Sequence, residues 1–237
     1  MILNYLKKIY YEKYSKKSYS LSNVDLIIER IFKNKKDGIF IDVGCNHPIK
    51  YNNTYLLYKK GWSGINIDLD LESIEQFNKL RSRDINIQAL VTSFDNEEKD
   101  LYFYHERSAI NTISKELAIS RDNQYKEIKK IKGRSLNSII ETSKFKDTKI
   151  DLLSIDIENY EYEALKYFNF ENYDIDIIVT EITDTDIKDL EIYNLTLENI
   201  INTNLYKLLI KKDYKLINWV NADLIFIKNT SKLQSFR

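Results

Sequence analysis

Side chains that could do chemistry stand directly after short apolar runs of the sequence. The run GIFIDVG leads to Asn46 and His47, and the run GINIDLD reaches Asp68. The run IDLLSID ends at Asp156, and Glu158 follows it closely. Carboxylates and imidazoles can take a proton from a reacting group or hydrogen-bond the hydroxyl groups of a ligand. The pattern therefore predicts one ligand site formed by the ends of several strands.

Glycine is concentrated around the first two of these runs. Four of the five glycines fall between positions 38 and 64, and the only proline, Pro48, lies among them. A glycine turn lets the backbone come close to a ligand. We therefore expect the strand that carries Asp42 to end in a turn at Gly44 whose backbone N–H groups face the ligand.

The elements that must position these residues alternate between strands and helices. Strands are predicted at 38–44, 64–70, 85–91, 150–156, 174–182, 214–220 and 222–228, and helices at 20–32, 53–60, 71–80, 160–168 and 195–212. This alternation is typical of a doubly wound α/β fold with a mostly parallel, seven-stranded sheet. The connection between the last two strands is too short for a parallel crossover, so the last strand must be antiparallel.

Segments outside this alternation are expected to be additions to one main domain over 36–230. Residues 1–35 are predicted to be an N-terminal helical extension, with Ser22 and Asp25 as the N-cap and N3 residues of its last helix, and residues 231–237 a tail. Residues 93–135 form a polar insertion that begins with a strand, and such insertions often carry substrate contacts. On the helix at 160–168, Glu161 and Glu163 are expected to face solvent.

The composition argues against several functional classes. The 237 residues include 36 Lys and Arg against 36 Asp and Glu, and 43% are hydrophobic. This balance argues against disorder and against a protein drawn to nucleic acid by its net charge. Cys45 is the only cysteine, and we expect a buried filler rather than a nucleophile. No apolar run approaches the length of a membrane span, and a cytoplasmic location is predicted.

A ligand with ribose and adenine but no pyrophosphate fits the strand ends best. Asp68 is suitably placed to accept hydrogen bonds from both ribose hydroxyls, and residues 88–91 offer an apolar wall of adenine size. NAD is the weaker alternative, because Gly44 alone stands where G-x-G-x-x-G would cradle a pyrophosphate. S-adenosylmethionine (SAM) has the required parts.

At these residues the chain resembles the FkbM-type methyltransferase family. FIDVGCNHP is similar to the first motif of that family, NNTYLLYKKGWSGINIDLD to the next helix and strand, and IDLLSIDIENYEYEALKYF to its hallmark acidic segment. The resemblance covers roughly residues 37–228 and implies a Rossmann-like class I methyltransferase that uses SAM. Asn159 stands where the family usually has glycine, but Asn tolerates a left-handed backbone. Asp68 stands where the family more often has glutamate.

The resemblance also implies which residues contact SAM. They are Gly44, Asn46 and Thr54 at the methionine end, Asp68 at the ribose, and Ala89 and Leu90 at the adenine, with Asp42 and Asp156, at two strand ends, as further candidates.

Methyl transfer to a hydroxyl group needs a base that takes the proton of the acceptor. The candidates are Asp156, ranked first because it ends a central strand, together with Glu158, Glu181, His47 and His105. A divalent cation held by Asp156 and Glu181 could instead lower the pKa of the hydroxyl, and this alternative stays open.

The resemblance makes a small molecule or a glycan the expected acceptor. We expect O-methylation of a sugar in a surface glycan or of its nucleotide-linked precursor. The alternatives are an amine, amide or natural-product acceptor, or a non-catalytic nucleotide-binding module. Whether the protein forms a homo-oligomer is left open.

Overall fold

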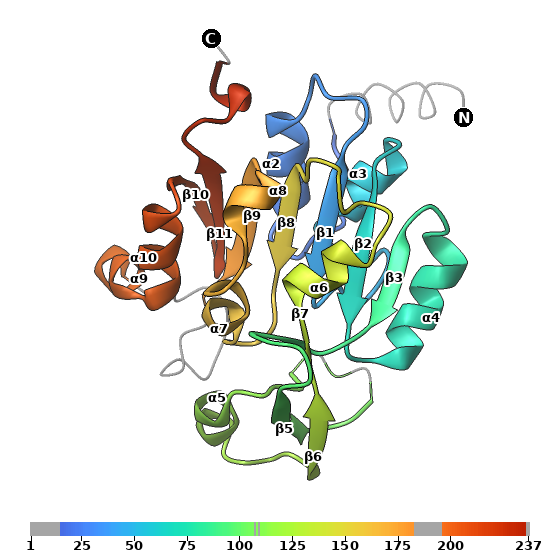
Figure 1. Ribbon diagram of the computed structural model, residues 1–237, viewed down its shortest axis with the longest axis vertical. Helices are drawn as coiled ribbons and strands as arrows, with labels where there is room; N and C mark the ends of the chain where they lie inside the picture. Colours follow the sequence, from blue (N-terminus) through green and yellow to red (C-terminus); the bar gives the residue numbers. More distant parts are fainter. Residues whose placement is uncertain (1–14, 107, 109, 183–195, 236–237) are drawn as a thin grey trace, which may run out of the picture.

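The computed structural model describes residues 15–106, 108, 110–182 and 196–235. Its centre is a seven-stranded sheet in the order β10-β11-β9-β8-β1-β2-β3 (Figure 1). The strands are β1 (Ile39–Val43), β2 (Ser63–Asp68), β3 (Ile85–Gln88), β8 (Leu152–Ile155), β9 (Ile177–Glu181), β10 (Tyr214–Val220) and β11 (Asp223–Lys228). β11 is antiparallel to both of its neighbours, and the other pairs are parallel. The predicted fold class, a doubly wound Rossmann-like sheet with an antiparallel last strand, is confirmed.

Helices cover both faces of this sheet. They are α2 (Val24–Ile31), α3 (Tyr55–Lys59), α4 (Leu71–Leu80), α6 (Leu136–Glu141), α7 (Glu161–Leu165), α8 (Phe170–Tyr173), α9 (Leu197–Asn202) and α10 (Asn204–Lys211). Alternating residues of one strand enter two different cores, because successive side chains of a strand point to opposite faces. Phe40 packs with α2 and Trp62, whereas Ile41 packs in the larger core with α6, α7 and α10.

The order of the strands creates a switch point between β1 and β8. The chain proceeds from β1 outward to β2 and β3 and then returns to β8 on the other side of β1. In open α/β sheets, ligands bind beyond the carboxyl ends of the strands at such a point. The topology therefore places the ends of β1, β2 and β8 around one location.

The insertion is more regular than its polar sequence indicates. β5 (Glu98–Phe103) pairs antiparallel with β6 (Glu127–Lys132), α5 (Lys115–Ser120) lies between them in sequence, and β4 (Val91–Thr92) pairs with β7 (Arg134–Ser135). Figure 1 shows β5, β6 and α5 as a small layer below the lower edge of the main sheet. The sequence predicted β5 but not β6 or α5.

Several predicted boundaries are wrong by a few residues. The third strand ends at Gln88 rather than at 91. The helix predicted over 195–212 is interrupted at Thr203. This residue has an extended backbone and is the N-cap of α10, and its side chain accepts from the N–H of Tyr206. Short polar side chains favour this capping role over a helix interior.

The first described helix also begins differently. Its N-cap is Asn23, in a left-handed conformation with φ 61°, instead of Ser22. Asp25 accepts hydrogen bonds from the hydroxyl of Ser18 and the N–H of Tyr19, and so fixes the chain that enters the helix. Residues 1–14 of the predicted N-terminal extension lie outside the described part of the chain. Within the described part, no helix is long and apolar enough to cross a membrane.

A buried guanidinium supports the loop that follows β1. Arg81 is fully buried and forms an ion pair of 2.8 Å with the equally buried Asp84. Its remaining N–H groups donate to the side chains of Thr54 and Asn52 at 3.0 and 3.2 Å. Thr54 in turn donates to Asp42 in β1, at 2.8 Å. The network compensates two buried carboxylates next to the switch point.

Replacing Arg81 by Met should lower the free energy of unfolding by about 3–5 kcal/mol, because removing one partner leaves buried carboxylates uncompensated. Denaturant unfolding measures this change. Lys79→Met, at an exposed position near the end of α4, is the matched control and should change stability by less than about 0.5 kcal/mol. Equal effects of the two substitutions would contradict a structural role for the network.

Candidate active site

A cavity of about 950 Å³ lies between the carboxyl ends of the strands and the β5–β6 hairpin. Eight of the predicted site residues line it: Gly44, Asn46, Asp68, Ala89, Leu90, Asp156, Glu158 and Glu181. They come from β2 and β9 and from the loops that follow β1, β3 and β8. The structure thus brings together the strand ends that the sequence singled out.

Gly44 is required by the close approach of two strand ends. It has φ +75°, and a Cβ atom there would lie 1.8 Å from the carbonyl oxygen of Asp156. The expectation that the N–H groups of this turn face a ligand is wrong. Those of Gly44 and Cys45 donate to the carbonyl of Ile67, and that of Asn46 donates to Asp68. These groups therefore provide no cradle for a pyrophosphate.

Asp68 is held by backbone N–H groups on both sides. Its Oδ2 accepts from Asn46 at 2.7 Å and its Oδ1 from Asp70 at 2.8 Å. Burial raises the pKa of Asp68 to about 6, although both hydrogen bonds act in the opposite direction. Each carboxylate oxygen has a second lone pair, so the group can still accept from the two hydroxyls of a ribose.

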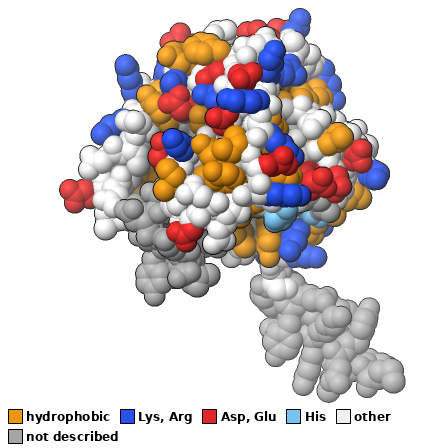
Figure 2. Space-filling view, turned by 90° about the horizontal axis from the view of Figure 1, so that it is seen from below, with side chains coloured by type: hydrophobic (Ala, Val, Ile, Leu, Met, Phe, Trp, Pro, Cys, Tyr) orange, Lys and Arg blue, Asp and Glu red, His pale blue; other side chains and the backbone are white. Residues whose placement is uncertain are grey.

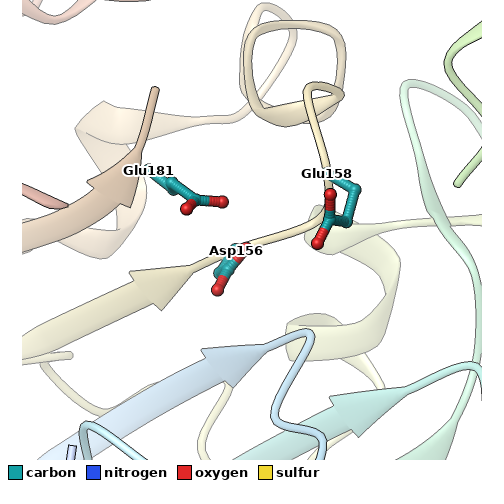
Figure 3. Close-up of side chains that lie close together, drawn as sticks. All are labelled: Asp156, Glu158 and Glu181. Carbon is teal, nitrogen blue, oxygen red and sulfur yellow. The ribbon is translucent and has the colours of Figure 1, made fainter. Parts of the chain in front are cut away.

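Three carboxylates that line the cavity converge on one another. Figure 3 shows Asp156 at the end of β8, Glu158 on the following loop and Glu181 at the end of β9, with their side chains directed toward one another. One oxygen from each lies within 4.8 Å of the others. Oxygen ligands of this kind suit a divalent cation such as Mg²⁺ or Mn²⁺. The same cluster could also move a proton.

Crowding raises the pKa of the carboxyl groups in this cluster. The side chain of Asp156 is accessible from the cavity but is surrounded by protein. Removal from bulk water raises its pKa well above the usual range, and Glu181, which hydrogen-bonds to it, and Glu158 raise it further. Burial also raises the pKa of Glu158 to about 7, against the opposing effect of Arg121.

The insertion holds Glu158 in place. Arg121 donates to Glu158 Oε2 at 2.6 Å, and the hydroxyl of Thr112 donates to its backbone carbonyl at 3.0 Å. Glu158 and Asn159 have φ of 57° and 71°, so the left-handed conformation allowed for Asn159 is present. Sequence reasoning missed Arg121 because it stands in a polar stretch without periodicity or motif.

Glu161 is buried, contrary to the expectation that it faces solvent. Only 4% of it is exposed, and its Oε1 accepts from the N–H of Ile157 at 2.8 Å. Burial raises its pKa to about 8. This hydrogen bond stabilises the turn between Asp156 and α7. The helical pattern of residues 160–168 could not indicate such a role.

Four predicted site residues do not line the cavity. Asp42 and Thr54 are buried in the Arg81 network, so they support the β1 turn rather than reach a ligand. His47 accepts from the N–H groups of Ile49 and Lys50 and fixes its own loop. His105 is exposed beside the cavity.

Cys45 is a buried filler, as the sequence predicted. It is 3% exposed and packs against Ile74 and Phe77 of α4. Burial raises the pKa of its thiol, so the group is not a nucleophile.

A model of the family described as the Methyltransferase FkbM domain matches residues 42–208, from β1 into α10. No curated protein matches the chain. Among solved structures, a TehB-like SAM-dependent methyltransferase from Corynebacterium glutamicum is 11% identical, with 95% of this chain and 97% of that chain covered and a TM-score of 0.41. A proposed type 11 methyltransferase from Sulfolobus solfataricus is also 11% identical, with 90% and 96% covered and a TM-score of 0.41.

Replacing Glu161 by Gln should change how stability depends on pH. The folded pKa of about 8 exceeds the ordinary value of 4.5, so the folded state binds an additional proton between these pH values. Wild-type stability therefore falls as pH rises through this window, by up to about 1.4 kcal/mol per pH unit from this group. The amide of Gln stays neutral and can still accept from Ile157, so the variant should gain stability relative to wild type from pH 5 to pH 8.

Urea unfolding at several pH values measures this difference. Glu163→Gln, at a neighbouring side chain that is 38% exposed, is the control and should follow the wild-type curve. Parallel curves for wild type and Glu161→Gln would refute the buried, protonated state of Glu161.

Proposed function

Because this chain belongs to the family of FkbM methyltransferase domains and is a SAM-dependent methyltransferase, we propose that it methylates a hydroxyl oxygen of a sugar. The acceptor sugar is part of a surface glycan or of its nucleotide-linked precursor. One observation carries the proposal: Asp68, which can hold a ribose, and the carboxylate cluster around Asp156 line the same cavity.

The residues around the β1 turn suit SAM better than a dinucleotide. Asp68 offers two acceptor oxygens for the ribose hydroxyls, and Ala89 and Leu90 line the cavity beside it as a surface for adenine. The N–H groups of the turn already bond Ile67 and Asp68, so a pyrophosphate would find no donors there. SAM, when bound, supplies a methyl group on a positively charged sulfonium sulfur. The neutral thioether that remains after transfer is a good leaving group.

The carboxylate cluster supports removal of the acceptor proton. Asp156 and Glu181 are hydrogen-bonded carboxyl groups, and a pair that shares one proton retains one carboxylate that can accept another. That remaining carboxylate is the group that can take up the proton of the acceptor. In this mechanism Asp156 accepts the proton of the acceptor hydroxyl, while Glu158, fixed by Arg121, orients the acceptor. A divalent cation held by the same three carboxylates is the second arrangement that fits them.

Cofactor preference tests the proposal through thermal unfolding. SAM and its demethylated product should stabilise the protein by about 2.7 kcal/mol at concentrations of about 100 times Kd, and NADH should have no effect. Asp68→Ala should lose this stabilisation, since the ribose hydroxyls lose their acceptors. Stabilisation by NADH alone would overturn the proposal in favour of a dehydrogenase.

Replacing Asp156 by Asn should lower kcat for methyl transfer by about 10²–10⁴-fold, because the amide cannot accept the proton of the hydroxyl. Transfer of labelled methyl from SAM to a panel of sugars, with and without a chelator, measures turnover. The stabilisation by SAM should persist, which separates loss of chemistry from loss of cofactor binding. Asp147→Asn, at a side chain that is 88% exposed, is the control. Full activity of Asp156→Asn would remove this residue from the mechanism.

A further inference from the structure

The β5–β6 hairpin contributes three apolar side chains and one lysine to the lining of the cavity. In an antiparallel pair, directly opposite residues share a face of the ribbon. Leu101 lies opposite Lys129, and both line the cavity, together with Phe103 and Ile131 of the same face. Three of these four side chains are apolar. These four side chains therefore form a largely apolar wall of the cavity that also holds the carboxylate cluster, and we call this wall the roof.

The opposite face of the hairpin carries charged pairs as well as Tyr102 and Ile128. Asp100 and Lys130 lie opposite each other there and form an ion pair of 2.5 Å. The surface seen from below mixes acidic, basic and apolar side chains (Figure 2). The apolar side chains that the hairpin contributes to the cavity lining are Leu101, Phe103 and Ile131.

The charged side chains that line the cavity are predominantly acidic. Among the described lining residues, eight carry a carboxylate and two carry a cationic group. Asp156, Glu158 and Glu181 are the closest group of these carboxylates. Because carboxyl groups outnumber cationic groups in this lining, it offers few groups that could bind the charge of a phosphorylated ligand.

Both cationic groups of the described lining are already paired. Arg121 bonds Glu158 at 2.6 Å. Lys129 lies 3.3 Å from Glu127, and its ammonium group is 3.4 Å from the centroid of the Phe103 ring. Recognition of phosphate relies on cationic side chains or N–H groups that can be directed at its oxygens. To bind a phosphate group, Arg121 and Lys129 would each have to break an ion pair with an acidic partner.

We propose that the acceptor is uncharged or cationic and packs an apolar face against Phe103 and Ile131, and that phosphorylated acceptors are excluded. This inference rests on the proposed function and narrows it. It favours a glycoside or an amino sugar without phosphate over a nucleotide-linked sugar.

The test compares matched forms of the same sugars on the full chain loaded with the demethylated cofactor. For each of several hexoses, calorimetry measures binding of the methyl glycoside, the phenyl glycoside, the phenyl glycoside of the 2-amino sugar, the 1-phosphate and the nucleoside-diphosphate form. The phenyl and amino forms should bind at least about tenfold more tightly than the phosphorylated forms. Equal or tighter binding of a phosphorylated form would overturn the inference.

Two further outcomes separate this inference from the proposed function. Binding of the demethylated cofactor without binding of any sugar form would overturn the acceptor class and leave methyl transfer intact. Failure of the cofactor itself to bind would instead overturn the proposed function.

A pair of substitutions on β6 tests the roof. Ile131→Thr, on the cavity side, should reduce the preference for the phenyl over the methyl glycoside by about three- to tenfold. Ile128→Thr, at a position 48% exposed, is the matched control and should leave the preference unchanged. An unchanged preference in Ile131→Thr, with the fold intact by circular dichroism, would refute contact between the acceptor and the hairpin.

Discussion

The close approach of the β1 turn to the end of β8 is the constraint on which the site depends. A side chain at position 44 would collide with the backbone of Asp156, so glycine is required there by packing as well as by its positive φ. With the two strand ends in contact, the N–H groups of the turn donate hydrogen bonds to Ile67 and Asp68 of β2. The ribose-type carboxylate and the acidic cluster thereby come to share one cavity.

Two arginines from different parts of the chain keep this arrangement of carboxylates in place. Arg81 lies beneath the β1 loop and compensates Asp84, while its hydrogen bond to Thr54 extends the network to Asp42. Arg121 crosses from the insertion to Glu158. Because a buried carboxylate is costly without a partner, acidic residues can gather here only where such partners or backbone N–H groups are available.

Different parts of the fold form the two sides of the cavity. The parallel strands, which are buried on both faces, provide the ends that form one side of the cavity. The insertion contributes the other side and is tied to it at Glu158 through Arg121 and Thr112. The family model matches residues 42–208, which include both parts, and the insertion carries the features from which we infer the acceptor.

The sequence by itself determined the sheet, its antiparallel last strand and the strand ends at Gly44, Asp68 and Asp156, because periodicity and glycine placement are local signals of burial and turns. It did not reveal that Glu161 is buried or that Arg121 reaches Glu158. Those facts depend on contacts that only the folded chain creates, between side chains whose spacing carries no regular pattern. Tertiary packing alone therefore decided which polar residues face the cavity and which support it.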